Sequence, residues 1–270
     1  MWYARAILPA VPEGDTIHHA ANRIRPVLEG RVPEQIRTPQ RRHDADRWPQ
    51  RLQGRAVAAV EARGKHLLLH FDGDLVLHSH LRMSGSWAVY DEGERWRRAP
   101  RRAWLVLESG GRQVVQFDGP LLELMTEART RSDPRLATLG QDVLGERFDE
   151  ALLIRRIRED DPTRCFGDAL IDQRTIAGIG NIWKSESCYA AGADPWKPVA
   201  LTADETVLAT VAFARREMAV SAREGFIARP RAVYGRAGEP CRRCGGAEAI
   251  RSAGQGDGNR TTYWCPGCQR

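Results

Sequence analysis

The feature that most constrains the fold of this chain is a set of four cysteines near its C-terminal end. Cys241 and Cys244 form one CxxC pair, and Cys265 and Cys268 form a second pair after twenty intervening residues. Four thiolates at this spacing suit tetrahedral Zn²⁺, and the loop between the pairs is long enough for a β-hairpin that folds when metal binds. Because four protein ligands leave no open position for water, the sequence predicts one structural zinc ion.

The length and composition of the chain indicate an intracellular protein with more than one core. Its 270 residues fit two cores plus a small appended module. No apolar run approaches the length of a membrane span, and the start lacks the pattern of a secretory signal. We therefore expect a cytoplasmic protein without a membrane partner, in which paired cysteines bind metal and Cys165 and Cys188 are buried as small hydrophobes.

The charge distribution favours a polyanionic partner. The chain has a formal net charge of +6, and from Arg229 to the end there are eight arginines against three acidic residues. A local positive field of this kind attracts nucleic acid. A solvated basic face is the alternative explanation.

The first half of the chain has the pattern of an antiparallel β-sandwich preceded by a helix. Apolar residues recur at helical spacing over 15–28, with Asp15 as a possible cap and Pro26 as a point where the helix kinks or ends. Short Val- and Leu-rich runs then alternate with the turn signals Asp72-Gly73 and Gly110-Gly111. Strands are expected on both sides of Asp72-Gly73 and over 86–90, 103–108 and 112–117.

From about Asp133 onward the pattern becomes helical. Asp149 is placed to cap one helix, Thr202 and Glu205 form a capping-box pattern ahead of another, and Gly225 supplies a stop signal. The predicted fold class is therefore α+β, with an N-terminal antiparallel sandwich, a helical domain and a C-terminal zinc-ribbon finger.

A glycine-rich turn precedes a helix that is expected to begin near Asn181. The segment reads Arg-Thr-Ile-Ala-Gly-Ile-Gly-Asn-Ile-Trp, with Gly180 directly before Asn181. Backbone N–H groups and the positive end of the helix dipole make such a turn an anion site, for which a DNA phosphate is a suitable guest. An ordinary corner between two helices explains the same residues.

The segment Pro12-Glu13-Gly14-Asp15-Thr16 carries a different chemistry. A chain-terminal proline is a secondary amine that can attack an aldehyde carbon and form an iminium ion, and an adjacent carboxylate can move the protons that this step requires. Inside a chain the same residues are merely a turn.

Together and in this order, these three pieces resemble the formamidopyrimidine-DNA glycosylase and endonuclease VIII family, over almost the entire chain from Pro12 to Arg270. The family pattern is an N-terminal Pro-Glu, a Lys in a strand hairpin, a helix–two-turns–helix motif and a zinc finger whose hairpin tip carries an Arg. The residues at those places are Pro12, Glu13, Lys65 in ARGKHLLL, Asn181 in GIGNIW and Arg260 in GNRTTYWC.

The resemblance implies a bifunctional glycosylase and abasic-site lyase of base excision repair, acting on damaged double-stranded DNA. The enzyme would flip the damaged base out of the duplex, and the Pro12 amine would displace it and form a Schiff base, with Glu13 moving protons before β,δ-elimination. Lys65, Asn181 and Arg260 would grip phosphates around the flipped nucleotide. A clamp of this kind works as a monomer.

Departures from the family pattern favour the endonuclease VIII branch and oxidised pyrimidines as substrates. Residues 117–125 read FDGPLLELM in place of the Arg- and Phe-bearing DPRRFG-like loop of the 8-oxoguanine branch, and the segment FIARPRAVYGR before the finger is short. Met83, in HLRMSG, is similarly placed to the residue that wedges into the DNA stack. Its alternative role is a place in the sandwich core.

The residues before Pro12 conflict with this chemistry, because an acylated proline nitrogen cannot form an iminium ion. We hypothesise that translation starts at Val11, since a GTG codon reads Val internally and Met at initiation. The expected organisation is an extension over 1–11, a catalytic sandwich over 12–132, a helical domain over 133–230 and the finger over 231–270.

Other interpretations fit some of these residues. Lys65 could be an exposed strand-end charge. His78 and His80, two apart on one strand face, are expected to be hydrogen-bonded polar residues near the DNA groove or the domain junction. The chain could also be a non-catalytic zinc-ribbon DNA-binding protein, or a family member that lacks lyase activity because Pro12 is not N-terminal.

Overall fold

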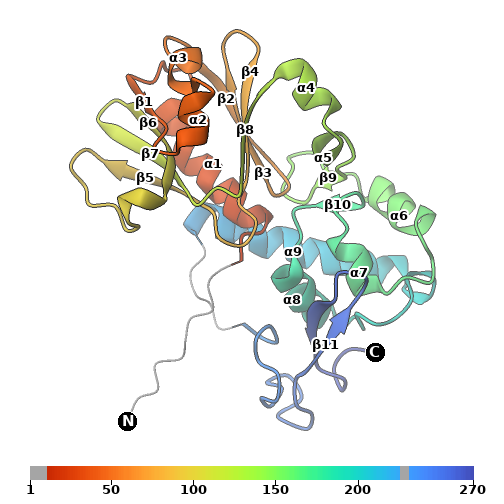
Figure 1. The fold of residues 1–270 in the computed structure, drawn as a ribbon. Coiled ribbons are helices and arrows are strands. Elements are labelled where there is room, and N and C mark those ends of the chain that lie inside the picture. Colours follow the sequence, from red (N-terminus) through yellow and green to blue (C-terminus); the bar gives the residue numbers. More distant parts are fainter. Residues whose placement is uncertain (1–10, 226–230) are drawn as a thin grey trace, which may run out of the picture.

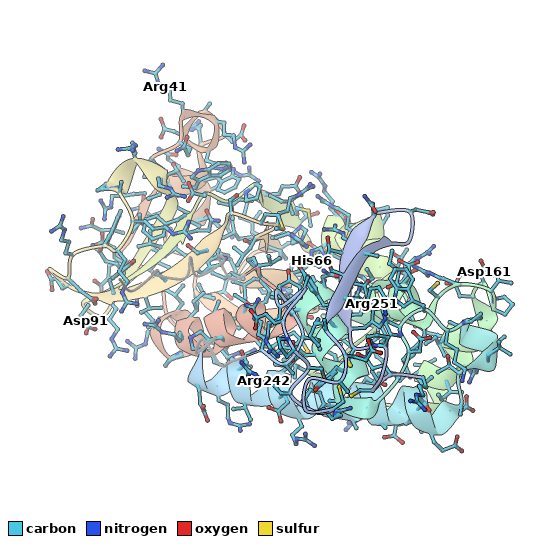
Figure 2. The ribbon with its side chains drawn as sticks, turned by 90° about the horizontal axis from the view of Figure 1, so that it is seen from below. Arg41, His66, Asp91, Asp161, Arg242 and Arg251 are labelled. Atoms are coloured by element: carbon cyan, nitrogen blue, oxygen red, sulfur yellow. The ribbon has the colours of Figure 1, made fainter. Side chains whose placement is uncertain are left out.

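The computed structural model describes residues 11–225 and 231–270. Most of the predicted N-terminal extension, before Val11, lies outside the described residues, as do residues 226–230 of the segment ahead of the finger. A β-sandwich forms one end of the molecule and a group of helices the other, with a short hairpin below the helices (Figure 1). Viewed from below, Arg41 and Asp91 lie at the outer end of the sandwich and Asp161 lies at the opposite end of the molecule (Figure 2).

Two four-stranded antiparallel sheets form the sandwich, in the orders β1-β6-β7-β5 and β2-β3-β4-β8. The strands are β1 (Gln35–Arg37), β2 (Val57–Arg63), β3 (His66–Phe71), β4 (Leu75–His80), β5 (Ser86–Asp91), β6 (Ala103–Ser109), β7 (Arg112–Phe117) and β8 (Leu121–Thr126). The hairpins at Asp72-Gly73 and Gly110-Gly111 are confirmed. The strands predicted on both sides of Asp72-Gly73 and over 86–90, 103–108 and 112–117 are confirmed as well.

Helix α1 (Gly14–Leu28) and the inward faces of both sheets enclose the main core of the sandwich. Leu67, Leu69 and Phe71 point into this core from β3, because alternate residues of a strand share one face. Ile17, Ala21, Ile24 and Leu28 of α1 pack against them. Two short helices, α2 (Arg41–Ala45) and α3 (Trp48–Leu52), follow β1.

The helical part of the chain has a separate core of its own. Its elements are α4 (Glu127–Ser132), α5 (Pro134–Ala137), β9 (Gln141–Asp142), α6 (Glu150–Glu159), α7 (Phe166–Ile171), β10 (Ile176–Ala177), α8 (Asn181–Ala191) and α9 (Asp204–Glu224), with 3₁₀ turns at Pro100–Arg102 and Val199–Leu201. Strands β9 and β10 pair in parallel.

A C-terminal hairpin, β11 (Arg251–Gln255) and β12 (Arg260–Trp264), stands between the two cysteine pairs. Figure 1 shows it below α7 and α8. The fold class is therefore as predicted: antiparallel sheets at the N-terminal end, a helical domain, and a C-terminal finger built around four cysteines.

Two local expectations about helix ends are wrong. Glu13, and not Asp15, is the N-cap of α1, and Thr16 completes a reciprocal capping box with it. The capping box at Thr202 does not form, because α9 begins after Ala203 and the Thr202 hydroxyl donates to the Pro198 carbonyl. Asp149 caps α6 as predicted, and Gly225 ends α9.

Among the described residues, no helix combines the length and apolar character that crossing a membrane requires. Cys188 is buried as expected, whereas Cys165 is only half-buried.

Candidate active site

The carboxylate of Glu13 lies at the N-terminus of helix α8. Its oxygens accept hydrogen bonds from the backbone N–H groups of Gly180 at 3.0 Å, Ile182 at 2.8 Å and Trp183 at 3.2 Å. Free N–H groups at a helix start, together with the positive end of the dipole, favour a negative charge at this point. The glycine-rich turn is thus an anion site whose guest is a carboxylate of the same chain.

This arrangement corrects the expectation for Gly180, whose backbone N–H was predicted to bind a DNA phosphate. The N–H of Gly180 is occupied by Glu13 and is not available to an external anion. Gly180 has a steric role instead, because a Cβ there would lie 2.3 Å from the Glu13 carboxyl carbon. Gly14 similarly approaches Gly178, to whose carbonyl it donates at 2.9 Å.

Burial sets the protonation of Glu13. Its side chain is almost completely buried, and this burial raises its pKa from 4.5 to about 7, against the opposing effects of Lys65 and of the backbone N–H groups of α8. A carboxyl group that titrates near neutral pH can both donate and accept a proton at working pH. Asp15, the next acid along, is also buried and accepts a 2.6 Å hydrogen bond from Ser221 on α9, so it joins two helices.

Lys65 occupies a tight turn that docks onto the same glycine-rich segment. The turn is held by Asp142, which accepts a 2.7 Å hydrogen bond from the N–H of Gly64 and a 2.9 Å bond from His18. Gly64 has φ 59°, and a Cβ at this position would also lie 2.8 Å from the Ala177 methyl group. The explanation of Lys65 as an exposed strand-end charge is therefore wrong, because the residue is half-buried against another domain.

Lys65 and Glu13 interact electrostatically. Desolvation lowers the pKa of the Lys65 ammonium, while the Glu13 carboxylate acts in the opposite direction. A lysine with a lowered pKa holds its charge less firmly and can take part in proton transfer. The two side chains come from segments 52 residues apart in the chain and lie close enough for each to affect the pKa of the other.

Pro12 directly precedes this cluster and lines a pocket of about 150 Å³ between α1 and the β4–β5 connection. Val11 precedes it in the described chain, and both residues are half-buried. The structure thus brings Pro12, Glu13 and Lys65 into one region, as the sequence predicted.

Asn181 and Arg260 meet where the finger hairpin contacts α8. The Asn181 amide donates a 2.6 Å hydrogen bond to the carbonyl of Thr261, the neighbour of Arg260 at the hairpin tip. Arg260 is exposed, and its charge is close enough to act on the pKa of Lys65. An exposed cation therefore stands near Glu13 and Lys65.

Sequence reasoning missed Lys184, one turn along α8 from Asn181. Its side chain is completely buried, and its Nζ donates to Thr262 Oγ1 at 2.6 Å and to Gln255 Oε1 at 3.4 Å. These contacts attach α8 to both strands of the hairpin. No local signal distinguishes this lysine, because its partners lie more than 70 residues away.

Met83 is 62% exposed, so the alternative that it belongs to the sandwich core is wrong. It follows Arg82, which has φ 47° and whose N–H donates to His80 Nδ1 at 3.1 Å. The structure thus places the apolar side chain of Met83 on the surface, on a turn with a constrained backbone.

His66, His78 and His80 form a stack on the outer face of the second sheet. His66 Nδ1 lies 2.8 Å from His78 Nε2, and the rings of His66 and His80 lie 4.7 Å apart. Burial is the largest factor that lowers the pKa of each, to about 4 for His78 and His80, so these rings are neutral near pH 7. The charges of Asp133 and Arg135, at the start of the helical part of the chain, affect the pKa of His78, which agrees with a place near the domain junction. The expectation of full hydrogen bonding is wrong for His78, whose Nδ1 has no hydrogen-bond partner among the described residues.

The four cysteines converge on one point beneath α8. Their sulfur atoms all lie within 4.8 Å of one another, and Cys241 and Cys244 approach Cys268 and Cys265 at 3.8 and 3.9 Å. Four sulfurs at these separations fit the tetrahedral ligand set of a metal site. The Tyr189 hydroxyl of α8 lies 3.3 Å from Cys241 Sγ and links this cluster to the helix.

Comparison with known protein families agrees with this geometry. Residues 11–120 match the formamidopyrimidine-DNA glycosylase N-terminal domain, and residues 139–223 match the formamidopyrimidine-DNA glycosylase H2TH domain. The chain belongs to the formamidopyrimidine-DNA glycosylase family.

Curated relatives place the chain within the endonuclease 8 branch of that family. A probable endonuclease 8 2 of Streptomyces coelicolor is 42% identical, with 96% of this chain and 94% of that protein covered. The DNA-(apurinic or apyrimidinic site) lyase Nei2 of Mycolicibacterium smegmatis is 36% identical, with 96% and 99% covered.

Solved structures share the fold at lower sequence identity. The formamidopyrimidine-DNA glycosylase of Lactococcus lactis, solved bound to DNA that contains an abasic site, is 22% identical, with a TM-score of 0.78 over 96% of this chain and 99% of that one. At this identity the likeness establishes the arrangement of the domains and no more.

Proposed function

We propose that this protein is a bifunctional DNA glycosylase and abasic-site lyase of base excision repair, with oxidised pyrimidines as its preferred substrates. The observation that carries the proposal is the Glu13 carboxyl group, buried on the N-terminus of α8 beside Pro12 and Lys65. A binding module has no need for a buried acid that titrates near pH 7 next to a lysine with a lowered pKa.

The proposed reaction begins with attack of the neutral Pro12 nitrogen on C1′ of the deoxyribose. The C1′–base bond breaks, the base leaves with the bonding electrons, and Glu13 gives a proton to the ring oxygen as the sugar opens. The resulting iminium ion accepts electrons when a general base of the protein removes the C2′ proton, and the 3′ phosphate then leaves. A second elimination releases the 5′ phosphate. Lys65 is proposed to assist these proton transfers and to hold the phosphates.

DNA contacts are proposed at the hairpin tip, the start of α8 and the turn after β4. Arg260 and Asn181 would bind phosphates next to the flipped nucleotide, and Met83 would fill the gap left in the stack. Exposure of Arg260 and Met83 supports this assignment. The partner is damaged duplex DNA, which a monomer can clamp between the sandwich and the helical domain.

The metal of the finger is proposed to be one structural Zn²⁺ held by Cys241, Cys244, Cys265 and Cys268. Thiolate sulfur is the ligand that zinc favours in closed four-coordinate sites, and the spacing of the sulfurs supports it. When bound, zinc supplies folding free energy to the hairpin and no catalytic chemistry. The domain boundaries proposed for the chain remain 12–132, 133–230 and 231–270.

The active form of the protein is proposed to begin at Pro12, after initiation at Val11 and removal of the initiator methionine. The family match beginning at residue 11 supports this start, as does coverage of 99% of the Mycolicibacterium lyase by 96% of this chain. Intact mass of protein from its native host tests it: retention of residues 1–11 contradicts a free Pro12 amine.

Reductive trapping with borohydride on duplex DNA that contains an abasic site tests the function as a whole. Protein beginning at Pro12 is expected to become covalently attached to the DNA, and the full chain is expected not to. A non-catalytic DNA-binding protein would bind the duplex and leave no adduct in either form. Trapping by both forms would show that the nucleophile is not Pro12.

A further inference from the structure

The pocket that Pro12 lines has two polar groups whose hydrogen-bonding roles the structure defines. It measures about 150 Å³ and is walled by apolar side chains that include Leu81, Trp87 and Val89. Thr16 and His19 of α1 face it from the same side. Residues three apart on a helix are neighbours on one face, and His19 lies about 4.5 Å further along the axis from Pro12 than Thr16 does.

His19 offers the pocket a hydrogen-bond acceptor. Its Nδ1 lies 3.1 Å from the carbonyl oxygen of Ala222, which can only accept, so Nδ1 carries the proton. In the neutral imidazole the other nitrogen, Nε2, is then a bare acceptor. Among the described residues none donates to Nε2.

The end of α9 lies against the His19 ring. Gly225 lies against the imidazole ring with φ 83°, and a Cβ there would stand 3.3 Å from Nε2. The Asn22 amide donates to the same Ala222 carbonyl at 3.2 Å and so helps to fix the helix end against which the ring is oriented. The orientation of His19 is therefore built by two helices.

Thr16 offers the pocket a donor. Its Oγ1 accepts from the backbone N–H of Glu13 at 3.4 Å, which leaves the hydroxyl hydrogen free to point elsewhere. The two guanidinium groups that also line the pocket have partners: Arg23 donates to the Val89 carbonyl, and Arg98 donates to Asp118 and the Ser84 carbonyl. Thr16 and His19 thus offer a ligand one donor near Pro12 and one acceptor beyond it.

We propose that this pocket receives the flipped pyrimidine and that His19 selects bases carrying a proton on N3. The inference rests on the proposed function, because the base is bonded directly to the C1′ atom that Pro12 would attack. The Thr16 hydroxyl donates to O2, which uracil-type and cytosine-type lesions share. His19 Nε2 accepts from N3–H, which uracil-type lesions have, whereas cytosine-type lesions present a second acceptor there.

Two lesions that differ on the N3–C4 edge of the ring provide the test. Protein beginning at Pro12 is given 5-hydroxyuracil and 5-hydroxycytosine in otherwise identical duplexes, and kcat/KM for excision is measured for each. An unpaired acceptor facing an acceptor loses both the hydrogen bond and its solvation, so 5-hydroxyuracil is expected to be excised about tenfold faster or more. Equal rates overturn the proposal.

Variants assign the selectivity to individual side chains. His19→Gln carries an amide that can turn to donate or accept, so the ratio of the two rates is expected to fall close to one. Thr16→Val is expected to slow both lesions by the same factor, and Thr16→Ser restores both. His70→Gln, the same change at a histidine paired with Glu61 and Glu127, is the matched control and keeps the wild-type ratio.

The outcomes separate this inference from the function on which it rests. Failure to trap on abasic DNA and to excise either lesion contradicts the proposed function. Normal trapping with an unchanged ratio in His19→Gln contradicts only the role of His19. Because the ratio compares two substrates of one variant, a loss of activity common to both does not alter it.

Discussion

Lys184 carries a buried charge, whose desolvation destabilises the folded state. Replacing it by methionine gives a quantitative test of the structure. Its ammonium is completely buried and donates to the neutral oxygens of Thr262 and Gln255. Lys184→Met removes the charge and keeps most of the volume. Thr262 keeps a partner in the variant, because its hydroxyl also donates to Gln255 at 2.9 Å.

The pKa of Lys184 sets the size and sign of the effect. Desolvation lowers it from 10.5 to about 8, against the smaller opposing effects of Cys188 and Asp168. That fall corresponds to about 3 kcal/mol. At pH values below about 8 the ammonium is charged in both the folded and unfolded states, and the full desolvation penalty is present. The penalty disappears as pH rises toward 10.5, where both states are neutral.

The free energy of unfolding of the wild type is therefore expected to increase relative to Lys184→Met by about 3 kcal/mol between pH 8 and 10.5. Urea unfolding at saturating zinc, followed by tryptophan fluorescence, measures both proteins across this range, and their difference cancels groups that titrate alike in each. Lys197→Met, at a half-buried lysine, is the matched control and follows the wild type. A difference that stays constant with pH, or that falls as pH rises, refutes the reasoning.

Three further predictions concern the proposed site. Glu13→Gln is expected to slow base excision by roughly a hundredfold or more in single-turnover assays, because the proton donor is lost, and an unchanged rate would exclude Glu13 from the chemistry. Met83→Ala is expected to weaken binding to damaged duplexes in fluorescence anisotropy and to change stability by less than about 0.5 kcal/mol, since the side chain is 62% exposed; a large fall in Tm would mean that it is a packing residue. Removing zinc with a chelator is expected to abolish DNA binding and to leave the sandwich folded, as judged by circular dichroism, with recovery on adding zinc to the wild type but not to Cys244→Ser. Binding that survives metal removal would contradict a structural role for the ion.

The parts of the fold that were predictable from sequence are those with local signals. The Asp72-Gly73 and Gly110-Gly111 turns require positive φ at glycine, and the structure has φ 77°, 57° and 70° at the three glycines. The spacing of the four cysteines predicts that they lie close together, because a shared metal site requires it. Strand β8, in contrast, was hidden in the run Leu121–Met125, whose apolar residues suit a helix as well as a strand.

The site itself depends on contacts that no local pattern contains. Glu13 accepts hydrogen bonds from N–H groups 167 to 170 residues away. The sequence predicts an anion site at the glycine-rich turn and a carboxylate at Glu13, but no local pattern shows that this carboxylate occupies that site. Lys65 reads as an exposed charge, because its burial comes from Ala177 and Gly178 packing onto the Gly64 turn. Long-range pairing of this kind becomes visible only when the domains are placed together.

Helix α8 connects the C-terminal finger to Glu13. The first turn of α8 binds the Glu13 carboxylate, and the side chains of Asn181 and Lys184 bind the hairpin. Glu186 accepts hydrogen bonds from the three backbone N–H groups of residues 232–234 at 2.8 to 3.0 Å. Tyr189, at its other end, touches the cysteine cluster. Because one helix carries all these contacts, we expect displacement of the finger to move the N–H groups that hold the Glu13 carboxylate. We therefore expect metal binding, whose first proposed ligand Cys241 lies 176 residues after Lys65 in the sequence, to influence the site through this single helix.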